Sequence, residues 1–172
     1  MDAIASIVKL DAIASIPYSV PMTKTSPSSP AVTAWARLMR VSRQLVEKAE
    51  DALKAASLPP LAWYDALHEL AEAGEAGLRP FELTDRVLLA QYGVSRLLTR
   101  LEADGLVEKL PVSNDGRGQI VRITSAGRDM RRRIWSIYGA SIAGLMGEKL
   151  STEELETLAR LLGLLRHPPI ER

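Results

Sequence analysis

The spacing of apolar side chains predicts a largely helical chain from residue 31 onward. Between residues 31 and 57, apolar side chains recur every three or four residues with charged side chains between them, which is typical of one long amphipathic helix. Pro59 and Pro60 follow that helix, and the second proline suits the first turn of the next one. The same periodicity predicts five further helices, at residues 61–74, 80–87, 91–105, 124–146 and 151–166.

Between the fourth and fifth of these helices the period changes from that of a helix to that of a strand. Residues 106–112 are strand-like in composition, and residues 120–124 alternate apolar and polar side chains. The segment 113–119 between them contains two glycines and is typical of a turn. The two short strands around a charged tip predict a β-hairpin. Three helices followed by a hairpin are typical of a winged helix-turn-helix, so the fold class is mainly α with a two-stranded wing (α+β).

The order of elements divides the chain into four segments. Residues 31–58 form an N-terminal dimerisation helix, residues 59–124 the winged helix-turn-helix domain, and residues 125–172 the C-terminal dimerisation helices. The terminal helices hold more Leu, Ile, Met and Ala than one small domain needs to cover itself, which favours a homodimer. The last of them begins with Ser151 and Glu154, three residues apart, the spacing of a capping box.

Residues 1–30 differ in composition from the rest of the chain. The hexapeptide DAIASI occurs at residues 2–7 and again at 11–16, and a stretch rich in proline, serine and threonine follows. This composition predicts a flexible arm or an over-extended reading frame, with Met22 as an alternative start. A different reading is an arm that wraps the dimer partner.

Composition excludes several kinds of chemistry. The chain has no cysteine, so disulfides, thiolate metal sites and cysteine-based redox switches are ruled out. Its two histidines, His68 and His167, lack metal-ligand spacing, so no metal or other cofactor is expected. No apolar stretch is long enough to span a bilayer, and no basic N-terminal region indicates a signal peptide, so a cytoplasmic protein without membrane contact is expected.

The net charge of +1 gives no support to nucleic-acid binding, but the local distribution does. Residues 91–133 hold nine Lys or Arg against five Asp or Glu, a net of +4, so the remaining residues sum to −3. This charge lies on the fourth helix, the hairpin and the start of the fifth helix, where a winged helix meets phosphates.

The fourth helix has an outward face suited to a DNA groove. When its Val and Leu side chains are buried, a polar set faces outward: Gln91, Tyr92, Ser95, Arg96, Thr99 and Arg100. The first four of these lie toward the N-terminal end and are candidates for reading base edges. Thr99 and Arg100 are candidates for phosphate contacts, and an ordinary solvated helix face is the alternative.

The hairpin resembles that of the MarR family of bacterial transcriptional regulators. In DGRGQIVRITSAG, Asp115 and Arg117 occupy the family's D-x-R positions, and Thr124 and Gly127 match its L-T-x-x-G, with Ile123 replacing the leucine. Upstream, LTRLEADGLVEKL is similar to the family's L-E-x-x-G-L-V passage, and the resemblance covers about residues 31–166.

The resemblance implies a homodimeric transcriptional regulator that binds double-stranded DNA at a pseudo-palindromic operator. We expect it to act as a repressor and to be associated with the nucleoid. Arg117 would reach the minor groove and Asp115 would pair with an arginine. Gly116 replaces the first of two arginines found in many members, so the tip carries one charge fewer. Lys109 stands where arginine is frequent and would contact phosphate without bidentate geometry.

Members of this family often bind small aromatic or phenolic effectors between the dimer helices and the DNA-binding lobe. Candidates for such a cleft are Trp35, Trp63, Tyr64 and His68, with Trp135 beside them. The alternative is that these rings fill the core and the dimer interface, with His68 bonded to a carbonyl group.

The sequence gives less support to two other functions. The sequence contains no nucleophile elbow, phosphate-binding glycine loop or paired-carboxylate signature, so no enzyme is expected. A winged helix that binds protein instead of DNA remains an alternative, although such a module has no need for a basic stripe formed by Arg96, Arg100 and Arg117.

Overall fold

The computed structural model describes residues 26–87, 91–112 and 115–165. The chain divides into two compact units, Met1–Arg37 and Leu38–Arg172, and helix α1 crosses the division. The predicted N-terminal arm up to residue 25, the alternative start at Met22 and His167 lie outside the described residues.

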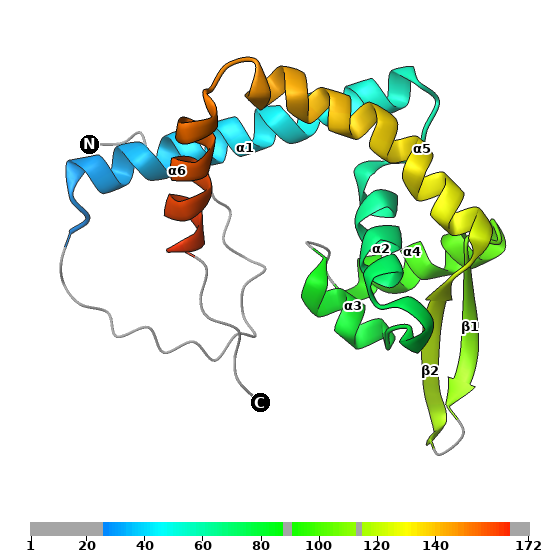
Figure 1. Cartoon of the computed structure of the whole chain (residues 1–172). Helices are drawn as coiled ribbons and strands as arrows, with labels where there is room; N and C mark the ends of the chain where they lie inside the picture. Colours follow the sequence, from blue (N-terminus) through cyan, green and yellow to red (C-terminus); the bar gives the residue numbers. More distant parts are fainter. Residues whose placement is uncertain (1–25, 88–90, 113–114, 166–172) are drawn as a thin grey trace. The chain divides into compact units, whose positions relative to one another are not determined.

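The elements follow the predicted order (Figure 1). The helices are α1 (Ser29–Ala55), α2 (Leu61–Glu72), the 3₁₀ turn η1 (Gly74–Ala76), α3 (Pro80–Arg86), α4 (Gln91–Ala103), α5 (Ser125–Ile142), the π-helical turn η2 (Ala143–Gly147) and α6 (Thr152–Gly163). The strands are β1 (Val107–Val112) and β2 (Asp115–Ile123). No helix in the described part of the chain is long and apolar enough to cross a membrane.

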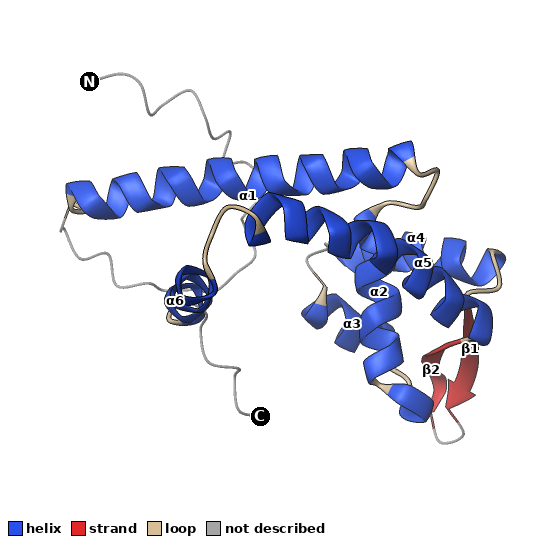
Figure 2. Ribbon diagram, turned by 45° about the horizontal axis from the view of Figure 1, so that its top comes forward, coloured by secondary structure: helices blue, strands red, loops and turns tan. Residues whose placement is uncertain are grey.

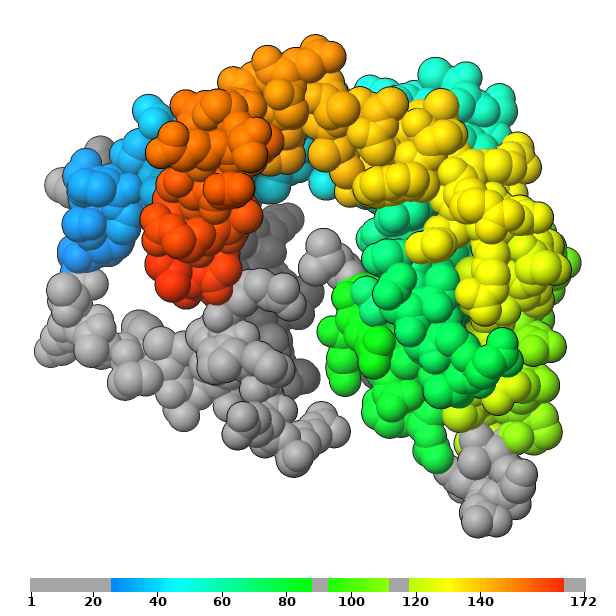
Figure 3. Space-filling view, in the orientation of Figure 1, coloured from blue at the N-terminus to red at the C-terminus, as the bar shows by residue number. Residues whose placement is uncertain are grey.

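The hydrophobic core of the second unit lies among α2, α3, α4 and the two strands. Its fully buried side chains come from every one of these elements except β1, and they include Leu67, Leu70, Leu83, Leu98, Leu101 and Val121. Helix α5 packs against α2, and the two helices lie side by side in the space-filling view (Figure 3). Ile134 of α5, which is fully buried, forms a second cluster with Leu53 and Tyr64. This arrangement confirms the predicted winged helix-turn-helix class.

The strands form an antiparallel hairpin, red in Figure 2, that projects beyond the helices in the view of Figure 1. The register pairs Val107 with Ile123 and Leu110 with Ile120. Leu78, just before α3, joins the outer side of β2 through two backbone hydrogen bonds with Val121, of 2.8 and 3.0 Å. The predicted two-stranded wing is therefore extended at its base by a single residue from the segment before α3.

Gly77 makes this extra pairing possible. Its φ of 66° is in the left-handed region, and a Cβ atom there would lie 2.6 Å from the carbonyl oxygen of Val121 and 2.6 Å from the Ile120 side chain. Glycine is thus required both by the backbone conformation and by the close approach of β2.

The glycine-containing tip differs from the prediction. Residues 113–119 were expected to form a turn, but the backbone is already extended from Asp115 onward. Pro111 pairs with Gln119 and Val112 pairs with Asp115, so Gly116, Arg117 and Gly118 are accommodated in β2 as an irregularity of the register. Such a bulge leaves residues out of the ladder and bends the strand, so a strand and a glycine-rich tip are compatible here.

The helix ends also depart from the periodicity in one place. The fifth helix was expected to run through about Met146, but α5 ends at Ile142 and continues as a π-helical turn. The amide of Glu148 donates to the carbonyl of Ala143, at 2.9 Å, which is an i→i+5 bond. The predicted capping box at α6 is confirmed, because Ser151 Oγ accepts from the amide of Glu154 and the Glu154 carboxylate accepts from the amide of Ser151.

Candidate nucleic-acid interface

Helix α4 has one buried face and one outward face, as its sequence predicts. Its apolar side chains are at most 7% exposed: Val94, Leu97, Leu98 and Leu101. The side chains that alternate with them are all exposed: Ser95, Arg96, Thr99 and Arg100. The helix is held between α3 and β1, so burial of one face fixes which polar groups the other presents to a ligand.

The two arginines on the outward face are available for an external partner. Arg96 and Arg100 are exposed, and neither forms an ion pair with any residue that the structure describes. Thr99 Oγ1 donates to the carbonyl oxygen of Ser95, at 3.1 Å, so its hydroxyl already has a partner within the helix. The side chains of Gln91 and Tyr92 lie outside the described residues, although their backbone forms the first turn of α4.

The predicted phosphate ligand Lys109 is engaged within the protein. Its Nζ lies 2.6 Å from Oε2 of Glu102 near the end of α4, and only 20% of its side chain is exposed. Sequence reasoning missed this pair, because the two residues are seven positions apart across a turn whose geometry the sequence pattern does not specify.

At residues 115–117 of the wing, the structure describes the backbone alone. Asp115 and Arg117 lie in β2, and their side chains are outside the described residues, as are residues 113 and 114. Gln119, which was not among the predicted site residues, is exposed on the same strand. The sequence analysis placed Gln119 in a turn that ended at residue 119, so it did not consider this side chain as part of a strand.

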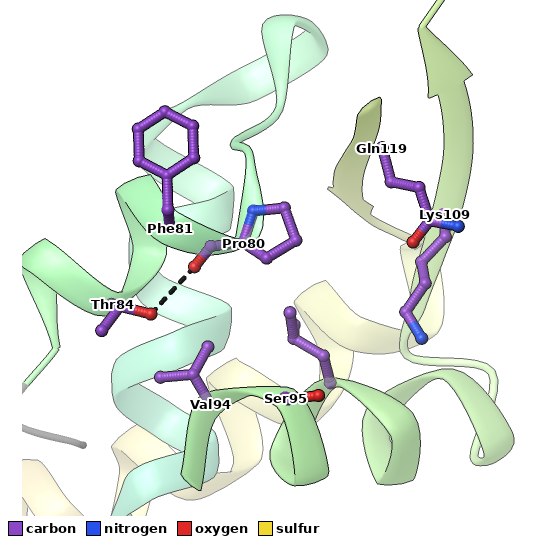
Figure 4. Close-up of a pocket in the computed structure, with 8 residues that line it drawn as sticks. Pro80, Phe81, Thr84, Val94, Ser95, Lys109 and Gln119 are labelled. Carbon is purple, nitrogen blue, oxygen red and sulfur yellow. Dashed lines mark hydrogen bonds between the residues drawn. The ribbon is translucent and has the colours of Figure 1, made fainter. Parts of the chain in front are cut away.

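The helix-turn-helix and the wing enclose a hollow of about 180 Å³ (Figure 4). Phe81 and Thr84 reach it from α3, Ser95 from α4, and Lys109 and Gln119 from the strands. Phe81 is 51% exposed, although it is a large apolar side chain. Lys109 extends from β1 toward α4 across this hollow.

The remaining arginines of the basic stretch have varied surroundings. Arg132 pairs with Asp129 one turn away on the surface of α5. Arg131 points inward, and its guanidinium nitrogen lies 3.0 Å from Nδ1 of His68. The local excess of positive charge is therefore concentrated at fewer positions than the sequence count of nine basic residues indicates.

Two of the proposed effector residues, Tyr64 and His68, belong to an aromatic stack that also includes Trp135. Tyr64 is 8% exposed and stacks on His68 and on Trp135, with ring centroids 5.6 Å apart in both pairs. Tyr138 meets Tyr64 edge-on at 5.3 Å. Trp63 packs against both hydrophobic clusters, whereas Trp35 on α1 is 66% exposed.

Burial changes the ionisation of groups around this stack. The pKa of Asp65 is raised, mainly because burial disfavours its charge, and Glu69 and Glu50 add to the effect while His68 opposes it. The pKa of Tyr64 is raised by burial, with Arg131 opposing, and burial also raises that of Tyr138. Among the described residues, no group of three or more His, Asp or Glu side chains could hold a metal ion.

The fold and the outward arginines of α4 define a winged helix-turn-helix protein of the kind that meets nucleic acid through its recognition helix and wing. The sequence model of a family described as the MarR family matches residues 56–118. The multiple antibiotic resistance protein MarR of Escherichia coli (strain K12) is 34% identical over 88 residues, which are 51% of this chain and 60% of that protein.

Solved structures support the same fold. Sco3205, a MarR family transcriptional regulator from Streptomyces coelicolor in complex with DNA, matches with a TM-score of 0.73 at 21% identity over 82% of this chain and 88% of its own. The organohalide-sensing transcriptional regulator RdhR-CbdbA1625, in its 2,4-dichlorophenol-bound form, matches with a TM-score of 0.69 at 21% identity over 88% of this chain and 87% of its own. Over residues 56–118 the chain is similar to the MarR family of winged helix-turn-helix transcriptional regulators, and it spans 60% of the length of the Escherichia coli relative.

Proposed function

We propose that this protein binds double-stranded DNA sequence-specifically as a homodimer and represses transcription from a pseudo-palindromic operator. The supporting observation is the outward face of α4, where Arg96 and Arg100 are exposed and unpaired among the described residues, while the opposite face is buried. A buried apolar face fixes the helix in place, and exposed arginines on the other face match the acceptors of guanine and the phosphates.

The roles of individual residues follow from their places. Ser95 and Arg96 lie in the N-terminal half of α4, where a recognition helix reaches base edges, and Gln91 and Tyr92 precede them on the same helix. Arg100, closer to the C-terminal end, is assigned to phosphate. Arg117 is assigned to the minor groove, and Asp115 to holding the wing arginine in position.

Selection of bound fragments from random-sequence duplex DNA tests the proposal. The expected product is a palindrome with half-sites about one helical turn apart. On that duplex, Arg117→Ala is expected to weaken binding and to lower the slope of log affinity against log salt by about one unit. Arg96→Ala is expected to change the preferred bases as well as the affinity.

The two substitutions also separate the proposal from its alternative. A uniform loss for Arg96→Ala across all duplexes would reduce this residue to a phosphate contact, and an unchanged slope for Arg117→Ala would remove the wing from the mechanism. If the wild-type protein enriches no duplex at low salt, the winged helix serves another purpose, such as protein binding.

A small aromatic or phenolic effector is the second part of the proposal. An apolar hollow of about 210 Å³ lies between the second half of α1, α2, α5 and η2, with Leu61 and Tyr138 in its wall. A hollow of this volume accommodates only a small ligand. The stacked rings of Tyr64 and Trp135 lie beside Tyr138, which is part of its wall. Release of a fluorescent duplex by 2,4-dichlorophenol, used as a probe, tests this part, with phenol-free buffer as the control. As a regulator of bacterial transcription, the protein would work in the cytoplasm.

A further inference from the structure

The ion pair between Glu102 and Lys109 joins the two elements that the proposed function assigns to DNA. Glu102 lies one residue before the end of α4, and Lys109 is the third residue of β1. Their charged atoms are 2.6 Å apart. The pair therefore bridges the recognition helix and the wing on the far side of the turn that connects them.

The position of Glu102 near the C-terminal end of α4 is unfavourable for a carboxylate unless a cation such as Lys109 lies beside it. A carboxylate in the last turn of a helix lies next to the negative end of the helix dipole, which disfavours it. An ammonium group at 2.6 Å offsets this repulsion and makes the carboxylate tolerable at that place. Without Lys109, Glu102 would oppose both the helix dipole and the phosphates of an approaching duplex.

The surroundings of Lys109 fix its side chain in this direction. The side chain is only 20% exposed, and it shares the walls of the hollow with the buried Val94 and Leu98 of α4. Lysine commonly buries its methylene stem along apolar surface while its ammonium group selects a partner. Here that partner is a protein carboxylate.

The turn between the two charged residues is itself anchored. Thr124 Oγ1 donates to the carbonyl of Gly105, at 2.8 Å, and the amide of Thr124 donates to the carbonyl of Leu106, at 3.1 Å. The backbone bonds hold the base of the wing, and the ion pair lies further out, where it can restrict the angle between β1 and α4.

We propose that Lys109 is a positioning residue, held by Glu102 so that the wing keeps a fixed orientation relative to α4, and that it is not a phosphate ligand. This inference rests on the proposed function, since the orientation matters only if helix and wing meet the same duplex. A lysine whose charge is compensated by an adjacent carboxylate adds little to the release of counterions from DNA.

A charge-reversed pair distinguishes positioning from phosphate contact. Lys109→Glu alone places two carboxylates together, and it is expected to weaken binding to the selected duplex by about fivefold or more. The double substitution Glu102→Lys with Lys109→Glu rebuilds the pair in reverse and is expected to recover affinity beyond the product of the two single effects. The matched control is Asp104→Lys with Lys109→Glu, which has the same net charge but no pair, and it should not recover.

A second measurement needs no DNA. Amide hydrogen exchange at Leu110 and Ile120, which are paired across the hairpin, is expected to accelerate in Glu102→Gln and in Lys109→Gln and to return to the wild-type rate in the reversed pair. If the single effects on binding simply multiply, if the Asp104 control recovers equally, or if exchange is unchanged, the positioning role is wrong. If the wild-type protein binds no duplex, the proposed function fails while hydrogen exchange still decides the role of the pair.

Discussion

Asp65 shows how one buried carboxyl group connects the core to solution conditions. It lies on α2 beside His68 and Glu69, and burial is the main reason that its pKa is raised. An acid whose folded-state pKa is higher than its unfolded value of about 3.9 binds more protons when folded. Its contribution to stability is therefore present below the unfolded pKa and is lost as pH rises through the folded pKa.

The substitution Asp65→Asn removes this dependence. At pH 7 the wild-type protein buries a charged carboxylate, which lowers its stability. At pH 3 the carboxyl group is already neutral. The free energy of unfolding of the variant, relative to that of the wild type, is therefore expected to be higher at pH 7 than at pH 3. Urea unfolding at both pH values measures the difference. Asp51→Asn, at an exposed position on α1, is measured at the same two pH values as the control for replacing a carboxylate by an amide. A gain for Asp65→Asn that is equal at pH 3 and pH 7 would contradict the account.

Individual residues also show the limits of reading function from a pattern. Ser95, Arg96, Thr99 and Arg100 were predicted to face outward because the burial of four apolar side chains at helical spacing leaves no other face for them. Lys109 was assigned to phosphate because charge counting treats each basic residue separately. Its pairing with Glu102 depends on how α4 and β1 meet, and no local period reports that geometry.

At the scale of elements, the contact between α5 and the turn before β1 depends on one glycine. A Cβ atom at Gly127 would overlap the carbonyl oxygen of Leu106 and lie 2.8 Å from the Ile123 side chain. The Gly127 amide also donates to Thr124 Oγ1, at 3.1 Å, which caps α5. The first turn of α5 can therefore approach the base of the wing only without a side chain.

Gly127→Ala is accordingly expected to destabilise the fold by about 2–3 kcal/mol, because the obstacle is backbone that cannot move away as a side chain would. Chemical unfolding at constant slope measures the loss. Gly144→Ala in η2 is the matched control, since a Cβ atom there meets nothing within 4 Å, and it should leave stability unchanged or slightly higher. Equal effects of the two substitutions would show that the close approach carries no strain.

The elements that sequence predicted and those that it missed differ in the range of the interactions that form them. The helices were predicted within a few residues because their caps and apolar faces are local, as at Ser151 and Glu154. The pairing of Leu78 with Val121 joins segments 43 residues apart. Only a single residue of the first segment takes part, so no alternation of apolar and polar residues in the sequence predicts it. The π-helical turn at residues 143–147 and the irregular register of β2 likewise depend on packing that periodicity does not contain.

At the scale of the whole molecule, the described helices expose several large apolar side chains, and these are the basis for the proposed dimer. On α6, Leu158, Leu161 and Leu162 lie three or four residues apart and therefore on one side of the helix. Leu161 is 47% exposed and Leu162 38% exposed, and Leu165 beyond the helix end is 68% exposed. A second copy of the chain would cover such a face, because closed two-fold interfaces bury the same patch on both partners.

Leu161→Lys tests this idea with little risk to the fold, because the side chain is already half exposed. Light scattering at micromolar concentration is expected to give the mass of a dimer for the wild type and that of a monomer for the variant. Glu156→Gln, on the opposite side of the same helix and with the same change in net charge, is the control and should remain dimeric. Affinity for the selected palindrome should fall at least about tenfold in Leu161→Lys, since two linked half-sites bind more tightly than one. An unchanged mass for this variant would move the interface away from α6, and a monomeric wild type would remove the dimer altogether.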